Sequence, residues 1–288
     1  MKLRKSERKK AKIRLALQGP SGSGKTYSSL LLAKGLTNGD LSKVVIIDTE
    51  NGSADLYAHI GNYKVLTLPT PFSPEKYAEA IDLCEKAGME VIILDSITHC
   101  WEFLLNYHSS LSGNSFTNWA KVTPRQKLFV DRMLQSSCHI IATVRTKQAY
   151  ILNQKDGKYI PEKIGLKAIQ RDGMDYEMTL VFDVDIKHNV VASKDRTGLF
   201  MGKPEFIINS STGKKILGWC NSTATLSELK VKVESAASLE ELSNLYREHV
   251  GMAKDIEQNF IQKRDLLEKL TNHKNHILNG TTNSHPRA

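Results

Sequence analysis

Residues Gly19 to Thr26 read GPSGSGKT and match G-x-x-x-x-G-K-[S/T], a pattern that binds phosphate groups between a strand and a helix. Glycines let backbone N–H groups turn toward phosphate oxygens, and the N-terminus of the following helix favours negative charge. Lys25 would reach the β- and γ-phosphates, and the Thr26 hydroxyl would bind Mg²⁺. A glycine-rich turn without a ligand is the alternative. We expect nucleoside triphosphate binding by the whole loop, which comprises Gly19, Pro20, Ser21, Gly22, Ser23, Gly24, Lys25 and Thr26.

Two apolar runs deliver carboxylates that could complete such a site. VIILDS contains Asp95 at the end of a buried strand, where open α/β sheets place ligands, so Asp95 could anchor Mg²⁺. VVIIDTEN turns Asp48 and Glu50 to the same side, because side chains alternate along a strand. Glu50 could then polarise a water molecule for attack on the γ-phosphate. An ordinary strand-capping aspartate and an exposed loop acid are the alternatives.

The segment SKDRTGLF places two cations, Lys194 and Arg196, at the end of another apolar run. Being two residues apart, they lie on the same side of an extended chain. A cation brought to the charge that develops during phosphoryl transfer accelerates hydrolysis, and one supplied by a neighbouring subunit makes hydrolysis depend on assembly. The alternative is a pair of solvated cations near Asp195.

The polar stretch 145–173 is too long for a simple connection in a compact domain, and such stretches are usually functional or disordered. Cations can follow a nucleic-acid backbone, while aromatic rings can stack on bases without reading sequence. A flexible lysine-rich loop is the alternative. Trp119 could contribute to binding or belong to the core, and His99 and Trp101 receive no role. The candidate DNA-binding residues are Arg145, Lys147, Tyr150, Lys155, Lys158, Tyr159, Lys163, Lys167 and Arg171.

Strands that alternate with helices and then follow one another predict an α/β fold, with a mostly parallel sheet and an antiparallel extension. The strands expected at 177–188 and 189–195 should form a hairpin that turns at residues 188–189. Helices are expected at 27–36, from Ser73 to Gly88, after Asp95, and near 123–134. The expected strands are 13–17, 43–48, 64–68, 90–95, 139–144, 177–188, 189–195 and 205–209.

The chain divides by composition into a basic arm at 1–12, a core at 13–220, a helical appendage at 221–270 and a disordered tail at 271–288. The formal charge of the 288 residues is +9, and residues 1–14 hold eight Lys or Arg against one Glu. Such an arm is either a solvated tail or attracted to phosphates. The four widely spaced cysteines favour buried free thiols. The absence of a long apolar run argues against a membrane span or a secretory signal, and a cytoplasmic location is expected.

From Ile13 to Ile208 the chain resembles the RecA-like ATPases. The matching segments are GPSGSGKT, IIDTENGSADLY, VLTLPTPFSPEKYAEAIDLCEKAG and VIILDSIT. The resemblance implies Glu50 as the catalytic base and Asp95 as the acid on the magnesium side. The stretch 145–173 takes the position of the DNA-binding loop. Lys194 and Arg196 take that of a lysine finger pair reaching the γ-phosphate of a neighbouring subunit.

Within that superfamily, the chain is most similar to the small phage-type ATPases of single-strand annealing. The pointers are DSITHCWE, NSFTNWAKV, TVRTKQAY, DYEMTLVFDVDIKH and SKDRTGLF. One departure concerns the Asn-Gln pair that RecA-type recombinases place after the fifth strand, because Thr143 and Val144 stand there. The Thr143 hydroxyl could sense the phosphate, but a glutamine switch onto the DNA loop is absent.

We therefore expect a single-stranded DNA-binding ATPase that uses ATP and Mg²⁺, forms a homo-oligomer as a filament or ring, and promotes annealing or strand exchange in recombination. The helical appendage could dock a single-strand-binding protein, another recombination factor or its own core. Alternatives are a replicative motor or loader of the same fold, a small-molecule P-loop kinase, and a module that binds ATP without turnover. A kinase predicts an arginine-rich lid, whereas this chain has the D-x-E strand and the late Lys-Arg pair.

Overall fold

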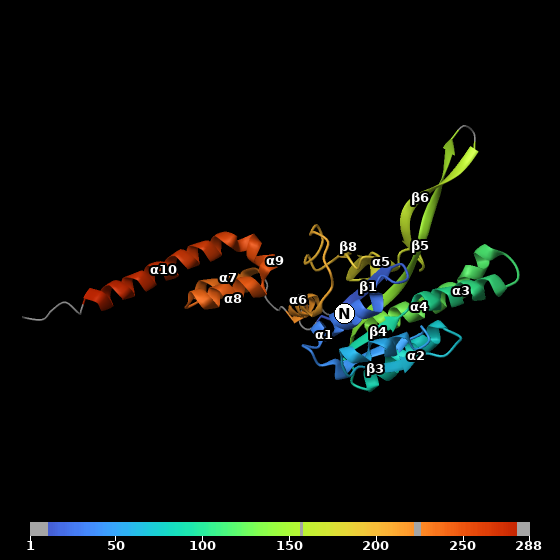
Figure 1. The fold of residues 1–288 in the computed structure, drawn as a ribbon, viewed down its shortest axis with the longest axis horizontal. Coiled ribbons are helices and arrows are strands. Elements are labelled where there is room, and N and C mark those ends of the chain that lie inside the picture. Colours follow the sequence, from blue (N-terminus) through green and yellow to red (C-terminus); the bar gives the residue numbers. More distant parts are fainter. Residues whose placement is uncertain (1–10, 156–157, 222–225, 281–288) are drawn as a thin grey trace, which may run out of the picture. The chain divides into compact units, whose positions relative to one another are not determined.

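The computed structural model describes residues 11–155, 158–221 and 226–280 (Figure 1). Side chains are described for these residues except 149–164, 226–227, 251 and 272–280. The chain forms two compact units, one from Ala11 to Cys220 and a second that includes the residues from Asn221 onward. The first unit contains every candidate site residue.

A single sheet with the strand order β3-β2-β4-β5-β1-β7-β8 organises the first unit, and β6 pairs with β5 outside this order. The strands from β3 to β7 in that order are parallel, whereas β8 and β6 are antiparallel to their partners. This arrangement confirms the predicted α/β class. The strands are β1 (Arg14–Gly19), β2 (Val44–Asp48), β3 (Lys64–Thr67), β4 (Val91–Asp95), β5 (His139–Lys155), β6 (Lys158–Ala168), β7 (Leu180–Val184) and β8 (Val190–Asp195).

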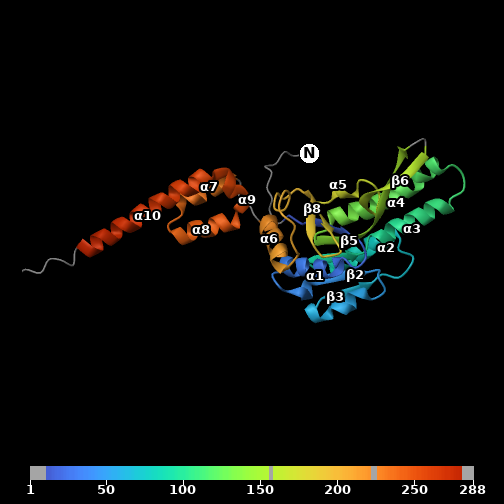
Figure 2. The same ribbon diagram turned by 45° about the horizontal axis from the view of Figure 1, so that its top comes forward.

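Helices cover both faces of this sheet, and each face has its own apolar core (Figures 1 and 2). Leu30 of α1 belongs to one core, and Tyr77 of α2 and Phe129 of α4 belong to the other. Both faces of β2 and β4 are buried, which explains why these strands are continuous aliphatic runs. The helices are α1 (Lys25–Leu36), α2 (Pro74–Lys86), α3 (Thr98–Ser110), α4 (Ser115–Gln135), α5 (Met174–Glu177) and α6 (Ser210–Asn221), with 3-10 turns η1 (Leu41–Lys43) and η2 (Ser53–Ile60).

Local signals place the start and end of α2. The Ser73 side chain accepts a hydrogen bond from the Lys76 backbone N–H, and Pro74 occupies the first turn. Gly88 follows the helix with a φ of 74°, a conformation in which glycine costs least. The predicted boundaries at Ser73 and Gly88 are therefore confirmed. The helix α4 begins at Ser115, earlier than the expected 123, because Asn114 caps it and Pro124 is accommodated inside it.

The polar stretch after β5 differs from the expected loop. Strand β5 continues as far as Lys155 and pairs with β6 in a long antiparallel hairpin that projects from the core (Figure 1). Asp156 and Gly157 stand between the paired residues Lys155 and Lys158. Asp-Gly is among the strongest sequence signals for a two-residue hairpin connection, so the sequence carried this information.

The expected strand at 205–209 is reduced to an isolated bridge between Phe206 and Val190. Both Phe206 and Phe200 instead contact the ring of Phe182 edge-on, with centroid separations of 5.7 and 5.0 Å. Aromatic packing holds this segment to the sheet without a continuous ladder. All four cysteines are buried and none forms a disulfide, as expected.

The second unit is a small helical bundle around Leu229, Leu242 and Phe260. Ser238 caps α8, since its hydroxyl accepts the Glu241 N–H while the Glu241 carboxylate accepts the Ala237 N–H. Its helices are α7 (Leu226–Ser235), α8 (Leu239–Glu248), α9 (Val250–Ala253) and α10 (Glu257–Gly280), with η3 (Lys254–Ile256) between the last two.

The helix α10 continues to Gly280, past residue 270, where we expected the helical appendage to end. Extending an existing helix costs less than starting one, so aperiodic residues without proline can follow. Residues 281–288 of the expected tail and residues 1–10 of the basic arm lie outside the described residues.

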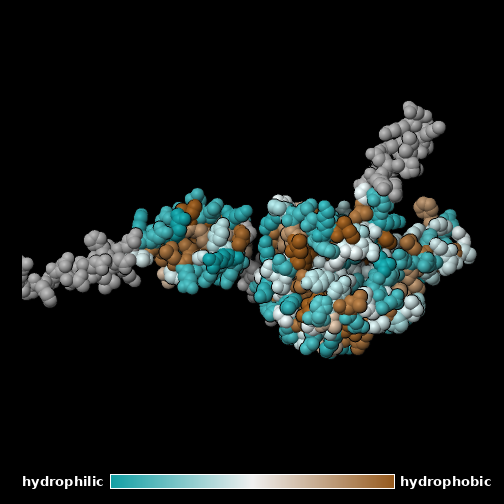
Figure 3. All heavy atoms as spheres, viewed as in Figure 1, coloured by the Kyte–Doolittle hydropathy of each residue, from teal (hydrophilic) through white to brown (hydrophobic). Residues whose placement is uncertain are grey.

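No helix within the described ranges is long and apolar enough to cross a membrane. The visible face of the core shows hydrophilic and hydrophobic residues in a mosaic (Figure 3).

Candidate nucleotide-binding site

The loop from Gly19 to Thr26 joins the carboxyl end of β1 to the first turn of α1. Gly22 and Gly24 have φ values of 78° and 80°, in the left-handed region that other residues avoid. A Cβ atom on Gly19 would lie only 2.4 Å from the Val184 carbonyl oxygen. The glycines of the motif are therefore required by backbone geometry.

Lys25 bends back over its own loop. Its Nζ donates to the carbonyl oxygens of Gly19 and Pro20, at 3.0 and 2.8 Å. Burial lowers the pKa of Lys25, although Asp95 and Glu50 act in the opposite direction. A bound triphosphate would offer this ammonium group oxygen acceptors with full charge, which form stronger hydrogen bonds than carbonyls.

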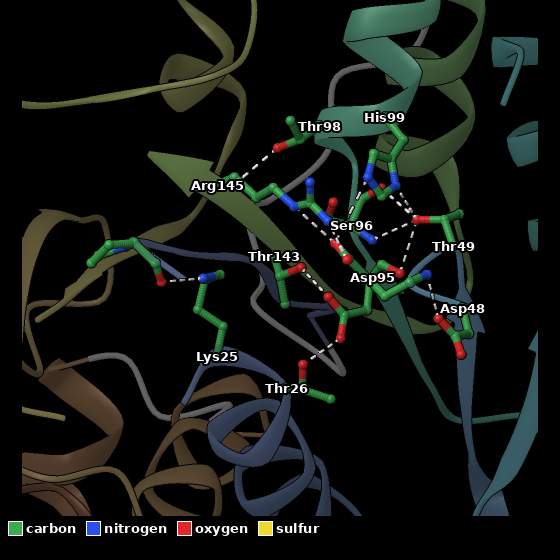
Figure 4. A network of polar contacts seen from close by, with 12 residues as sticks. Lys25, Thr26, Asp48, Thr49, Asp95, Ser96, Thr98, His99, Thr143 and Arg145 are labelled. Atoms are coloured by element: carbon green, nitrogen blue, oxygen red, sulfur yellow. Dashed lines mark hydrogen bonds and ion pairs between the residues drawn. The ribbon is translucent and has the colours of Figure 1, made fainter. Parts of the chain in front are cut away.

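Asp95 lies at the centre of a hydroxyl network beside the loop (Figure 4). Its Oδ2 accepts the Thr26 hydroxyl at 2.6 Å, and its Oδ1 accepts the Thr143 hydroxyl at 2.5 Å. Burial raises the pKa of Asp95, and these two hydrogen bonds oppose that shift. Thr143 is fully buried, and its hydroxyl orients Asp95. The expectation that Thr143 contacts the nucleotide stays a prediction.

Glu50 follows β2 and faces the same cavity. Arg145 of β5 binds the Glu50 carboxylate through two nitrogens: Nε lies 3.0 Å from Oε1, and a terminal nitrogen donates to Oε2. Asp48 is completely buried, and its Oδ1 accepts the Glu50 backbone N–H at 2.6 Å while its Oδ2 has no partner in the structure. The backbone of Glu50 is thus fixed from one side and its side chain from the other.

His99 was given no role from the sequence, and the structure places it next to this acid. Its Nδ1 lies 2.8 Å from the Thr49 hydroxyl, and its Nε2 lies 4.0 Å from Glu50 Oε1. The ring stacks on Phe72, with centroids 5.1 Å apart. Only tertiary structure could reveal this contact, because His99 begins α3 after β4 while Thr49 and Glu50 follow β2.

Residues of the phosphate loop and of the neighbouring strand ends surround one open cavity of about 790 Å³. Lys25 and Thr26 contribute from the loop, Glu50 and Asp95 from strand ends, and Tyr57 and Ile207 provide apolar wall. The volume is typical of small-molecule sites, and most of the lining side chains are polar. A cradle of strained glycines beside a hydroxyl–carboxylate pair fits a triphosphate with Mg²⁺, which binds through one or two protein ligands plus phosphates.

A comparison with protein families gives independent evidence of the family to which this domain belongs. Residues 11–207, well over half of the chain, match the model of the AAA domain. The chain belongs to this family. It is an ATPase domain of the AAA type, with the phosphate-binding loop that the sequence predicted. A search of curated proteins finds no significant match.

The two late cations of the AAA domain lie together, as their spacing predicted, but away from the cavity. Lys194 Nζ donates to the Asp175 carbonyl at 2.5 Å, and Arg196 donates to the Tyr176 carbonyl at 2.7 Å. The Arg196 backbone N–H bonds to Thr179, whose own N–H bonds to Arg14 at the start of β1. The phosphate loop follows the other end of β1. Roughly 17 Å of strand therefore separates this loop from the level of the Arg196 backbone.

The candidate DNA-binding residues are divided between three places. Arg145 binds Glu50, and Arg171 donates to the Thr123 hydroxyl of α4 at 3.3 Å. Lys147 and Lys167 are exposed and directly opposite one another in the hairpin register, and Lys167 also contacts Asp172 at 2.8 Å. The side chains of Tyr150, Lys155, Lys158, Tyr159 and Lys163 lie outside the described part of the chain, although their backbones belong to β5 and β6.

Trp119 is neither fully buried nor isolated. Its ring stacks on His108 with a centroid separation of 4.3 Å and on Trp101 at 6.0 Å. These residues join α3 to α4 (Figures 1 and 2). The contact accounts for Trp119 and Trp101 as a packing pair between the two helices.

Proposed function

We propose that this AAA domain is a Mg²⁺-dependent ATPase that binds single-stranded DNA through the β5–β6 hairpin and promotes annealing or strand exchange in DNA recombination. The chain would work as a homo-oligomer, in a filament or ring. The finer resemblance to RecA-like annealing ATPases gives the direction of this proposal. The contacts of the described residues support its separate steps.

The nucleotide would be held by the loop from Gly19 to Thr26, with Lys25 on the terminal phosphates. The Thr26 hydroxyl lies 2.6 Å from Asp95 Oδ2, and these two groups would hold Mg²⁺ directly or through water. When bound, the metal ion neutralises charge on the phosphate oxygens. Thr143 keeps the Asp95 carboxylate turned toward this position, because it occupies the other oxygen.

Glu50 would orient and deprotonate the attacking water. It is the carboxylate that lines the cavity without a hydroxyl partner, and its backbone is fixed by Asp48. While Arg145 binds both oxygens, the carboxylate has less capacity to accept the proton of a water molecule. Movement of Arg145 would therefore release the base.

The observation that carries the DNA proposal is the path of β5. This strand passes Thr143 and Arg145 at the site and continues without interruption into the hairpin. There, Lys147 lies directly opposite Lys167. Like charges opposite one another destabilise a strand pair, and a bound polyanion would offset this repulsion further than the Lys167–Asp172 ion pair does. DNA on the hairpin would act on Arg145 through the same strand.

The positions of Lys194 and Arg196 support assembly. The Arg196 backbone lies level with Arg14 at the start of β1, roughly 17 Å of strand from the loop of the same chain, and Lys194 lies level with Ala16. Neither cation lines the cavity of its own chain, so we expect them to approach a γ-phosphate that belongs to another subunit. A cation supplied in this way would make hydrolysis depend on subunit contact.

The proposal is tested by fluorescence anisotropy with a labelled oligothymidine strand and with a duplex, with Mg-ATP, with Mg-ADP and without nucleotide. Steady-state ATP hydrolysis is measured on the same samples. We expect binding of the single strand in preference to the duplex and a hydrolysis rate that rises with DNA. Hydrolysis that is indifferent to both nucleic acids would leave an AAA ATPase without the proposed DNA role.

A further inference from the structure

The turn between β7 and β8 lies along the phosphate-binding loop. A Cβ atom on Gly19 would strike the Val184 carbonyl, and one on Gly22 would lie 3.5 Å from the Ile186 side chain. A Cβ atom on Gly24 would lie 3.0 Å from Nδ1 of His188. Alternate residues from the end of β7 into the turn therefore face successive glycines of the loop, with no room for a side chain at Gly19, a tight fit at Gly24 and ordinary contact at Gly22.

His188 adds a directed hydrogen bond to this contact. Its Nδ1 lies 3.0 Å from the carbonyl oxygen of Ser23. A carbonyl oxygen can only accept, so Nδ1 carries the proton in this contact. His188 has a φ of 69°, which is uncommon for a residue other than glycine and holds the ring over the loop.

The rest of the turn fixes the position of His188. The Asp185 carboxylate accepts the backbone N–H groups of Lys187 and Asn189, both at 2.8 Å. The His188 N–H also donates to the Asp185 carbonyl oxygen at 3.1 Å. An exposed turn with this many internal hydrogen bonds presents the imidazole in one orientation.

The consequence for the loop follows from peptide geometry. The peptide between Ser23 and Gly24 is trans, so its C=O and N–H point in opposite directions. A donor held on the Ser23 oxygen therefore turns the Gly24 N–H away from the imidazole, and both Gly24 and His188 line the nucleotide cavity. The Ser28 N–H holds the next carbonyl, that of Gly24, at 2.9 Å.

We propose that His188 is a positioning residue for nucleotide binding, which orients the Ser23–Gly24 peptide so that the Gly24 N–H faces the phosphates. The inference rests on the ATPase function proposed above and adds a residue from outside the loop motif. The imidazole acts through the loop backbone and takes no part in proton transfer.

The test compares His188→Gly with His188→Asn in the full chain. Glycine accepts a φ of 69° without strain but removes the donor, whereas asparagine tolerates the same conformation and carries an N–H₂ group at nearly the position of Nδ1. Affinity for Mg-ADP is measured by titration calorimetry, and KM and kcat for ATP are measured in parallel. Circular dichroism verifies that both variants fold.

We expect His188→Gly to weaken Mg-ADP binding and raise KM by about fivefold to tenfold, the worth of one hydrogen bond, with kcat nearly unchanged. His188→Asn should recover most of the affinity. Equal affinity of His188→Gly and wild type, or an asparagine variant as weak as the glycine variant, overturns the inference. A wild type that binds Mg-ADP without hydrolysing ATP refutes the proposed function alone, because the affinities still test His188.

Discussion

Arg145 and Glu50 form a bidentate ion pair across two strand ends, with Arg145 Nε 3.0 Å from Glu50 Oε1. Glu50 follows β2 and Arg145 belongs to β5, and the order β2-β4-β5 places one strand between them. The pair spans the end of β4, where Asp95 lies. The candidate base is therefore bound by the first charged residue of the strand that leads into the hairpin.

Replacing Glu50 with glutamine should abolish hydrolysis and preserve nucleotide binding. Glutamine keeps the size and polarity of the side chain but cannot accept the proton of water at neutral pH. We expect ATP hydrolysis to fall by about a hundredfold or more, measured as phosphate release, with Mg-ADP affinity within about twofold of wild type.

Glu75→Gln is the matched control for this variant. Glu75 is also bound by an arginine in a bidentate pair, with Arg125 Nε and a terminal nitrogen at 2.7 and 2.8 Å, but it joins α2 to α4. Its loss should leave hydrolysis intact. An active Glu50→Gln enzyme would remove Glu50 from the mechanism.

Replacing Arg145 with alanine should uncouple the rate of ATP hydrolysis from DNA binding. With the carboxylate released, the rate without DNA should rise by a few-fold, and further stimulation by a single strand should be lost. Arg145→Lys retains the charge but cannot bind both oxygens at once, so an intermediate response is expected. The measurement is steady-state hydrolysis across a DNA titration. Unchanged stimulation in Arg145→Ala would disprove the coupling through this pair.

Removing the two opposed lysines of the hairpin should change the salt dependence of DNA binding. Each phosphate contact contributes a slope of about −0.7 to the logarithmic dependence of single-strand affinity on salt, so Lys147→Ala with Lys167→Ala should reduce the slope by roughly 1.4. Lys64 and Lys86 are exposed on β3 and α2, and their double alanine variant is the control with equal charge loss. Identical slopes for the two double variants would refute the hairpin site.

Buried His139 should make the core sensitive to acid. Its Nδ1 accepts the Ile13 N–H at 3.1 Å, and burial, with smaller effects of Lys12 and Arg14, lowers the pKa of His139 to about 3. The unfolded chain binds this proton near the ordinary value of 6.5, whereas the folded chain does not, so stability falls as pH decreases from 6.5 toward 3. The loss approaches about 1.4 kcal/mol per pH unit from this residue.

His139→Asn offers a direct comparison, because its side-chain oxygen can accept the same N–H without titrating. Urea unfolding at neutral and acidic pH should show a smaller loss of stability in this variant than in wild type. An equal loss in both proteins would assign the acid sensitivity to other groups.

The sequence predicted those parts of the site that depend on strand ends. Asp95 and Glu50 follow aliphatic runs, and parallel strands bring their carboxyl ends to one edge, so their proximity to Lys25 could be inferred. The pairing of Glu50 with Arg145 could not, because it depends on the order of β2, β4 and β5, which no local pattern encodes. The contact of His188 with the phosphate loop could not be predicted for a similar reason. It arises from a positive φ in a turn that meets a loop distant in sequence.

The hairpin was missed although the signal was present. Asp156-Gly157 favours a tight connection, but charged and polar residues on both sides obscure the alternation that would identify strands buried on one face. The described side chains of the projecting hairpin, those of Lys147, Gln148, Leu166 and Lys167, are exposed and show no buried face.

The central claim is that one subunit supplies Arg196 to the nucleotide bound by another, and mixing two inactive variants tests it most directly. Glu50→Gln lacks the base, and Arg196→Ala lacks the cation. If Arg196 acts across the subunit contact, an equal mixture with single-stranded DNA should regain roughly a quarter of wild-type hydrolysis, because random assembly pairs an intact base with an intact neighbouring cation at that frequency. A mixture no more active than the two variants alone would contradict hydrolysis completed by a neighbouring subunit.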